Sequence, residues 1–351
     1  MIPSAFGRSL RWSVGIEEEL FVLDAATLEP VPFPAELFDG ERLKAELFTT
    51  MVELTTGVCA SVEEAVGELT ELRARAKRLA AERGLVLAAA GTWPTADPAA
   101  QPVTQDEGFL RFAEYAGPSA RRQYCCGLHV HIGVESAERC MERLEAILPW
   151  LPLVLALSAS STYLAGRETG LASTRAEILT LLPRTGAPPV FGSYAEWERF
   201  AERLVELGLA DSTTRIWWDA RPHPRYGTLE IRMADQPTRL EATAALAALL
   251  QALVAGARPD GPADRGLYDQ NRWAALRFGR QAELVHLDGS RLVPAGELVA
   301  ELLERLEPAA RRLGSERYLG VLETLDQAGE QLELGRREGL RPLCERLAAL
   351  T

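Results

Sequence analysis

Short stretches in which apolar residues run together or alternate with polar ones predict β-strands in the first two thirds of the chain. These stretches cover residues 13–24, 51–54, 85–91, 128–134, 214–221 and 228–234. The connection 222–227 is short, so the last two stretches are expected to form an antiparallel pair. A small hairpin is predicted around Asp288 and Gly289.

Longer stretches carry apolar residues every three to four positions after a capping signal, and these predict helices. Serine or threonine followed three residues later by glutamate opens such stretches at Ser61, Ser193 and Thr238. The first of these helices is expected to end near Arg83, because Gly84 is of the residue type that most often terminates helices.

Further helices are predicted in the middle and at the end of the chain. Residues 136–161 form a helical region that Pro149 and Pro152 should bend. Residues 242–257 are uncharged but fall short of the roughly 20 apolar residues of a membrane-spanning helix, so a buried core helix is expected. Three helical stretches are predicted from about residue 294 onward.

This order of elements favours an α+β fold with a mainly antiparallel sheet flanked by helices. The proline-rich region after residue 29 is expected to be irregular. No internal repeat, low-complexity tract or long linker divides the sequence. We therefore expect residues 1–351 to form a single domain, with a helical C-terminal portion from about residue 295.

Composition and charge narrow the classes of partner. The net charge is -12, with 38 basic and 50 acidic residues, which argues against nucleic acid or an anionic membrane surface as the main partner. Small-molecule substrates are favoured. Five cysteines without paired spacing and the lack of a signal-peptide pattern predict reduced thiols and a cytoplasmic protein.

Three of the predicted strands carry charged or imidazole side chains where a buried strand would be apolar. Because side chains alternate along a strand, three pairs share a face: Glu17 with Glu19, His129 with His131, and Glu230 with Arg232. Burying unpaired carboxylates costs several kcal/mol each, roughly, unless they converge on cations or a charged ligand. The pattern indicates three strands that line one metal-containing cleft.

The donor types favour hard divalent cations. Glu53 adds a further carboxylate on a strand face, and an excess of carboxylates over imidazoles favours Mg²⁺ or Mn²⁺ over zinc. Solvated acids on an edge strand, a structural histidine pair and a structural salt bridge are the alternatives. The sequence has no P-loop, Rossmann or Gly-x-Ser-x-Gly motif, so any nucleotide would be held without a glycine-rich loop.

Taken together, five segments resemble the type 2 glutamate-cysteine ligases, the carboxylate-amine ligase family. They are residues 15–19, 53–57, 127–133, 221–232 and 271–273, in the order and spacing of that family. The resemblance implies a catalytic fold similar to glutamine synthetase, in which a curved antiparallel sheet forms a funnel around two or three divalent cations, Mg²⁺ or Mn²⁺. It also implies that ATP phosphorylates a substrate carboxylate and that an amine then displaces phosphate.

The resemblance also implies roles for individual residues. Glu17, Glu19, Glu53, His129 and Glu230 are expected to bind the metal ions. Arg232 is expected to stabilise the transferring phosphoryl group, while His131, Arg175 and Arg221 are expected to bind substrate. No residue is predicted to bind the adenine.

The predicted reaction is ATP-dependent formation of γ-glutamylcysteine from glutamate and cysteine, and relatives suggest a homodimer. Two alternatives stay open at the level of the sequence. A metal-dependent amidohydrolase would use the two histidines and the acids to activate water without a nucleotide. A non-catalytic relative would bind a nucleotide or metabolite without turnover.

Overall fold

The computed structural model describes residues 2, 4–258 and 261–351. Within these ranges, seven strands form one sheet in the order β2-β3-β1-β5-β9-β8, and β4 pairs with the end of β1 on the edge opposite β3. The strands are β1 Val14–Asp24, β2 Leu43–Ala45, β3 Met51–Thr55, β4 Leu85–Ala88, β5 Leu128–Gly133, β8 Ala220–His223 and β9 Thr228–Ile231. Every pair in this sheet is antiparallel, which confirms the predicted α+β class and sheet type.

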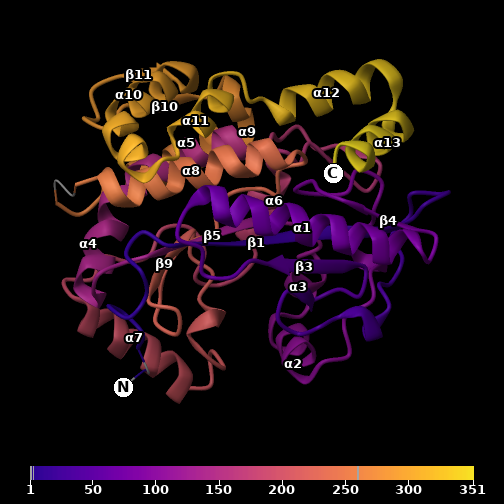
Figure 1. Cartoon of the computed structure of the whole chain (residues 1–351), viewed down its shortest axis with the longest axis horizontal. Helices are drawn as coiled ribbons and strands as arrows, with labels where there is room; N and C mark the ends of the chain where they lie inside the picture. Colours follow the sequence, from indigo (N-terminus) through magenta and orange to yellow (C-terminus); the bar gives the residue numbers. More distant parts are fainter. Residues whose placement is uncertain (1, 3, 259–260) are drawn as a thin grey trace.

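Helices cover both sides of this sheet (Figure 1). They are α1 Val62–Ala81, α2 Glu107–Ala116, α3 Pro118–Arg121, α4 Ala137–Ile147, α5 Leu151–Ser158, α6 Thr174–Leu179, α7 Tyr194–Glu206, α8 Leu240–Gly256, α9 Arg265–Phe278, α10 Ala295–Leu313, α11 Glu316–Leu319, α12 Gln327–Glu338 and α13 Leu340–Leu350. Two small hairpins complete the described strands, β6 Tyr163–Leu164 with β7 Arg167–Glu168 and β10 Glu283–Val285 with β11 Leu292–Pro294.

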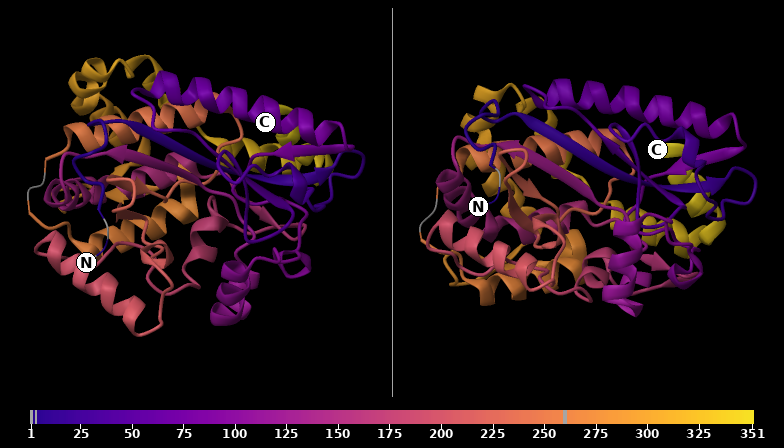
Figure 2. Two further views of the ribbon diagram at one scale, coloured as in Figure 1. Left: turned by 60° about the horizontal axis from the view of Figure 1, so that its bottom comes forward. Right: turned by 90° about the horizontal axis from the view of Figure 1, so that it is seen from below.

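Helices α1 and α8 lie along one face of the sheet, and α10 and α12 lie beyond α8 (Figures 1 and 2). The opposite side carries α2 and α7, which lie apart from each other (Figure 2). Ile16, Leu20 and Val22 of β1 are fully buried in the hydrophobic core that α8 shares. Residues at alternate positions of β1 therefore face the core, and those between them face the side of α2 and α7.

Glu18 lies among the core-facing residues of β1 and is neutralised there by α1. Arg73 Nε and Nη2 donate to the two Glu18 carboxylate oxygens at 2.6 and 2.7 Å, and Thr243 and Gln236 donate to Oε1. The Glu18 and Arg73 side chains are 0% and 4% exposed. This buried pair joins the central strand to α1, and it puts Glu18 on the opposite face from Glu17 and Glu19.

Several predicted helix signals are confirmed. Ser61, Ser136 and Ser193 are N-cap residues whose hydroxyls accept from the backbone N–H three residues later. The region after Ser136 is bent as expected, because a 3₁₀ turn at Leu148–Trp150 separates α4 from α5. Helix α8 is buried along most of its length.

Two local predictions are wrong. The strand expected over 214–221 begins at Ala220, and Thr213–Arg215 form a 3₁₀ helix. The apolar alternation that predicted this strand comes from Ile216 and Trp218, whose side chains are buried in the core although they lie in a loop. The second error is the cap at Thr238: α8 begins at Leu240, and the Thr238 backbone N–H donates to the side chain of Gln327.

The proline-rich region after residue 29 is largely irregular, as predicted, and it is followed by the short strand β2, which the sequence analysis missed. Within the described part of the chain, none of the helices combines the length and the apolar character needed to cross a membrane.

Candidate active site

The register of the sheet gathers the predicted polar side chains on one face. Glu17 of β1 lies opposite His129 of β5, and Glu19 lies opposite Glu53 of β3. On the other side of β5, His131 lies opposite Glu230 of β9, which in turn lies opposite Arg221 of β8. Because opposite residues of antiparallel strands point to the same face, five strands contribute to one charged row.

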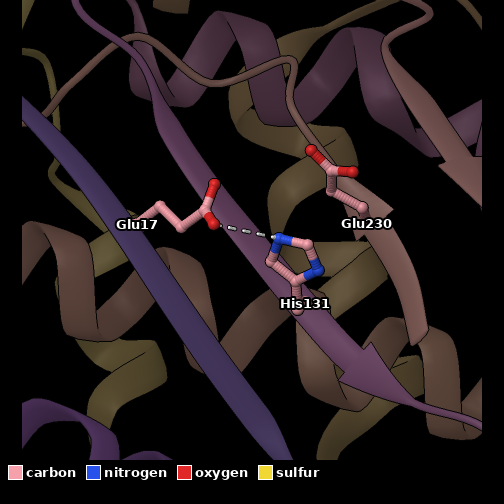
Figure 3. A group of neighbouring side chains, drawn as sticks. All are labelled: Glu17, His131 and Glu230. Carbon is pink, nitrogen blue, oxygen red and sulfur yellow. Dashed lines mark ion pairs between the residues drawn. The ribbon is translucent and has the colours of Figure 1, made fainter. Parts of the chain in front are cut away.

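A first cluster consists of Glu17, His131 and Glu230, whose ligand atoms lie within 4.8 Å of one another (Figure 3). His131 Nε2 lies 3.7 Å from Glu17 Oε1 and has no hydrogen-bond partner among the described residues. The other ring nitrogen, Nδ1, lies 3.0 Å from the Thr228 hydroxyl. Burial lowers the pKa of His131, but the carboxylates of Glu230 and Glu17 outweigh burial and raise it overall.

Glu230 is held by two arginines. Arg221 Nε and Nη2 donate to its two oxygens at 2.7 and 3.0 Å, and Arg232 Nη1 donates to Oε1. Burial alone would raise the pKa of Glu230, but both guanidinium groups hold it well below its usual range. Glu230 is therefore a carboxylate, and it positions Arg232 at the edge of the first cluster.

His129 lies between Glu17 of the first cluster and Glu19. Its Nδ1 is 3.3 Å from Glu17 Oε2 and 3.4 Å from Arg232 Nη1, and its Nε2 is 4.0 Å from Glu19 Oε1. Burial and the charge of Arg232 lower the pKa of His129 to about 4. The ring is therefore neutral near pH 7, which is the form that binds metal ions.

A second cluster consists of Glu19, Glu46 and Glu53, whose carboxylate oxygens also lie within 4.8 Å of one another. Burial raises the pKa of Glu19 to about 7. Burial and the charges of Glu19 and Glu53 raise the pKa of Glu46 well above its usual range, and burial and Glu17 raise that of Glu53. The three carboxylates therefore destabilise one another unless protons or cations neutralise them.

The carboxylates of this second cluster accept hydrogen bonds from one lysine and from neutral donors among the described residues. Lys44 Nζ donates to Glu53 Oε1 at 2.9 Å, and the Thr55 hydroxyl donates to the same oxygen at 2.8 Å. Glu19 Oε2 accepts from the Gly127 backbone N–H at 2.6 Å. Arg175 also lowers the pKa of Glu19, but less than burial raises it.

Both clusters have the chemistry of divalent-cation sites. Carboxylate oxygens suit Mg²⁺ and Mn²⁺, and imidazole nitrogen suits Mn²⁺ among other transition metals. If Nδ1–H of His131 donates to Thr228, the buried Nε2 lone pair is directed toward the carboxylates and needs a cation. The mutual repulsion of Glu19, Glu46 and Glu53 creates the same need.

The five residues predicted to bind metal are divided between the clusters. Glu17 and Glu230 lie in the first, Glu19 and Glu53 lie in the second, and His129 lies between them. His131 was predicted to bind substrate, and it lies in the first cluster. These roles stay predictions, because the geometry places the side chains without identifying what they bind.

Arg175 and Arg221 were predicted to bind substrate, and both are already engaged with the protein. Arg175 is 3% exposed, and it donates to the backbone carbonyls of Met233 and Arg232 at 3.2 and 3.1 Å. A Cβ added at Gly127 would lie 2.1 Å from Arg175 Nη2, so this glycine is required for the close approach. Arg175 thus supports the segment that carries Arg232, and its substrate role stays a prediction.

The sequence analysis did not single out Glu46 or Lys44. Lys44 belongs to β2 and lies opposite Glu53, and Glu46 follows β2 directly. The alternation from Leu43 to Glu46 is the signal that could have found them. It spans four residues and follows a proline-rich region, so it cannot be distinguished by pattern from an exposed loop.

Two hollows open along the charged row. The wide hollow, of about 630 Å³, lies toward the first cluster, and its lining includes Gly15, Glu17, Lys44, His131, Arg225 and Tyr226. The inner cavity, of about 130 Å³, lies toward the second cluster, and its lining includes Glu19, Glu46, His129, Arg232, Phe112 and Trp217. The charged row therefore faces a large hollow at one end and a small cavity with an aromatic wall at the other.

Comparison with known proteins gives a consistent result. A family model described as "Glutamate-cysteine ligase family 2(GCS2)" matches residues 13–340. A Rubrobacter xylanophilus protein named "Putative glutamate–cysteine ligase 2-3" is 41% identical over 362 residues, with 100% of each chain covered. A Sorangium cellulosum protein named "Putative glutamate–cysteine ligase 2" is 38% identical over 324 residues, covering 88% of this chain and 86% of that one.

Two solved structures share the fold. A bifunctional glutathione synthetase from Pasteurella multocida superimposes with a TM-score of 0.71 at 14% identity, covering 97% of this chain and 52% of the other. A glutamate–cysteine ligase from Francisella tularensis in complex with AMP gives the same TM-score and identity, covering 97% of this chain and 89% of the other. At this identity the similarity shows the fold alone, and it agrees with the predicted α+β fold.

Proposed function

The chain belongs to glutamate-cysteine ligase family 2, whose type is an ATP-dependent carboxylate-amine ligase, and we propose that it joins the γ-carboxylate of glutamate to the amine of cysteine. The proposed route is phosphorylation of the carboxylate by ATP, followed by displacement of phosphate by the amine. The observation that carries the proposal is the charged row. Its two clusters have ligand atoms suited to divalent cations, and residues of these clusters and Arg232 line the two hollows.

The wide hollow is the proposed nucleotide site. Its lining includes the cationic residues Arg42, Lys44 and Arg225, which can attract a polyphosphate, and the aromatic ring of Tyr226. Tyr226 stacks on His223 with the ring centroids 4.4 Å apart, so it offers a rigid apolar surface to a base. The volume of about 630 Å³ is in the range typical of small-molecule and cofactor sites.

The inner cavity is the proposed site of the reacting carboxylate. A carboxylate is a poor electrophile, and transfer of the γ-phosphoryl group gives it a leaving group. The two clusters would hold divalent cations, which neutralise the charge of the phosphates and the carboxylate when bound. Arg232 lines this cavity and is fixed by Glu230, so its guanidinium is positioned to stabilise the phosphoryl group during transfer.

Release of ADP measures the proposed reaction directly. With ATP, glutamate, cysteine and Mg²⁺ or Mn²⁺, we expect ADP, phosphate and γ-glutamylcysteine in equal amounts. Omission of either amino acid or chelation of the metal should abolish product formation. Tight binding of Mg-ATP without turnover for any amino-acid pair would instead identify a non-catalytic relative, and hydrolysis of an amide without ATP would identify an amidohydrolase.

We further propose that residues 1–351 act as one catalytic domain in the cytoplasm. The support for one domain is a hydrophobic cluster whose members extend from Val14 of β1 to Leu325, which precedes α12. The support for the compartment is that all five cysteines are buried free thiols, as a reducing environment maintains them. The homodimer stays a prediction that analytical ultracentrifugation would test.

A further inference from the structure

A third hollow adjoins the inner cavity where α2 meets the segment before β8. This outer groove has a volume of about 270 Å³, roughly twice that of the inner cavity. Its lining includes Phe112, Tyr115, Leu209, Ala210, Arg215 and Trp217. Phe112, Arg215 and Trp217 also line the inner cavity, so the two hollows meet at these three side chains.

The meeting point is aromatic. The rings of Phe112 and Trp217 pack with centroids 5.3 Å apart, and the guanidinium of Arg215 lies 5.2 Å from the Phe112 centroid. Farther out, Tyr115 is 50% exposed and Leu209 is 41% exposed. The groove therefore offers apolar surface, part of which stays in contact with water, and a ligand with an apolar body would cover it.

The charged groups around the outer groove are balanced by one another. Arg111 Nη1 donates to Glu107 at 2.5 Å, and Arg111 Nε lies 3.7 Å from the Asp211 carboxylate. Arg215 Nε lies 4.0 Å from the same carboxylate, and Arg215 Nη2 donates to the Gly108 carbonyl. Glu114 lines the groove as well, so two basic and two acidic side chains lie along it, which favours an uncharged ligand body over a charged one.

We propose that the enzyme accepts, besides cysteine, amines that carry an aromatic body, which lies in the outer groove while the amine nitrogen reaches the inner cavity. This inference rests on the proposed ligase function and extends its acceptor range. The inner cavity is small, so a glutamate bound there leaves the outer groove as the space for the acceptor. The small side chain of cysteine would leave the Phe112 and Trp217 surface uncovered.

The reaction is the same for either acceptor. The amine nitrogen forms a bond to the acyl carbon, the bond from that carbon to the phosphate oxygen breaks, and inorganic phosphate leaves with the proton that the nitrogen loses. An aromatic acceptor gains from burial of its ring on the groove. One methylene in an apolar pocket changes kcat/KM by about 10-fold or more, so a phenyl group should exceed that effect.

The test begins with hydroxylamine, a small amine that needs no groove. Formation of γ-glutamyl hydroxamate from ATP and glutamate would establish carboxylate activation independently of the acceptor. Alanine, cysteine, phenylalanine and phenethylamine are then compared by kcat/KM. We expect the kcat/KM of phenylalanine or phenethylamine to exceed that of alanine by about 10-fold or more.

Variants of the outer groove then test whether this groove is responsible for the preference for aromatic amines. In Trp217→Ala, the ratio of kcat/KM for phenylalanine to that for alanine should fall by about 10-fold, whereas Trp217→Phe should restore most of it. A ratio within one variant is insensitive to a general loss of activity. If Trp217→Ala does not fold, Tyr115→Ala at the exposed rim should lower the same ratio. Phe278→Ala removes an exposed ring from the end of α9 and should leave the ratio unchanged.

The two failures are distinguishable. Absence of hydroxamate would remove the proposed ligase function, together with the inference that rests on it. Hydroxamate formation with neither aromatic amine better than alanine would overturn the aromatic acceptor alone. An unchanged ratio in Trp217→Ala would overturn the placement of the acceptor on the outer groove.

Discussion

Single carboxylates of the second cluster oppose folding when no cation is present. Glu46 is the extreme case, because burial and two neighbouring carboxylates raise its pKa well above the usual range. Residues that destabilise the free protein in this way are common at functional sites. Their removal should therefore make the metal-free protein more stable and weaken its stabilisation by metal.

Glu46→Gln tests this relation. The amide keeps an acceptor for the Leu47 N–H but carries no charge. We expect the Tm of the metal-free variant to exceed that of the wild type by roughly 2 °C, equivalent to about 1 kcal/mol. Mn²⁺ should raise the Tm of the wild type and raise that of the variant less. Glu71→Gln, at an exposed position of α1, should change neither quantity.

The stabilisation by Glu46→Gln should depend on pH. The folded-state pKa of Glu46 is raised by burial above 4.5, so below pH 4.5 the carboxyl is protonated in both the folded and the unfolded chain. As the pH rises, ionisation favours the unfolded chain and the wild type loses stability. The difference in Tm between variant and wild type should therefore grow from pH 4 to pH 8. A difference that shrinks over this range would contradict the assignment.

Arg232 is expected to act on the rate more than on binding. Arg232→Lys keeps a positive charge but loses the planar group that reaches Glu230 and the inner cavity together. We expect kcat to fall by about 100-fold, with the KM for glutamate changed much less. Steady-state kinetics with saturating Mg-ATP measures both parameters. A large rise in KM at constant kcat would show that Arg232 binds substrate instead.

The buried ion pair of Glu18 and Arg73 is expected to stabilise the fold without taking part in the reaction. Arg73→Met leaves the Glu18 carboxylate buried without its counter-charge, which costs about 3–5 kcal/mol. Denaturant unfolding should show this loss, and Glu18→Gln in the same chain should recover part of it. Arg78→Met, on the exposed side of the same helix, should stay within about 0.5 kcal/mol of the wild type.

At the residue scale, alternation along a strand predicts which side chains share a face, and that sufficed for Glu17, Glu19, His129 and Glu230. It does not predict partners that are distant in the sequence. Arg73 lies 55 residues from Glu18, and its helix is amphipathic with or without that arginine on the buried side. Glu46 was missed because β2 is too short to produce a recognisable period.

At the scale of elements, capping signals and periodicity located most helices and strands, and loops caused the errors. Ser61 and Ser193 cap helices because the hydroxyl accepts a free backbone N–H of the first turn. Thr238 has the same capping pattern, with Glu241 three residues later, but its backbone N–H donates to the Gln327 side chain of a distant helix. A tertiary hydrogen bond thus overrides a local signal, and no local pattern contains that information.

The junction of β5 with the segment before β1 depends on Gly133. A Cβ at this position would lie 2.4 Å from both the Leu10 carbonyl oxygen and the Ser13 hydroxyl. We expect Gly133→Ala to lower the free energy of unfolding by about 1–3 kcal/mol, measured with urea. Gly67→Ala is the matched control, because nothing lies within 4 Å of a Cβ there and α1 should gain about 0.5–1 kcal/mol.

At the scale of the whole molecule, the C-terminal helices complete the packing around β4. Leu343, Cys344 and Leu347 of α13 belong to the same hydrophobic cluster as Ala88 of β4. The Thr351 hydroxyl accepts from the Ala89 N–H at 2.8 Å. The end of the chain is therefore joined to the strand that pairs with the apolar half of β1.

Leu343→Ala tests this contribution. Its side chain is 1% exposed, so its truncation should cost about 2–5 kcal/mol of unfolding free energy. Val321→Ala, at a partly exposed position between α11 and α12, should cost much less. Thermal unfolding of both variants measures the difference. Equal losses would mean that α13 contributes little to the fold.

The central strand β1 places Glu17 and Glu19 on the charged row and Glu18 against Arg73 on the other face. Deletion or insertion of one residue before Glu17 would exchange these faces, which would place Glu17 and Glu19 in the hydrophobic core and turn Glu18 away from Arg73. During divergence of this lineage, length changes should thus accumulate in the connecting loops, while this segment changes by point replacement alone.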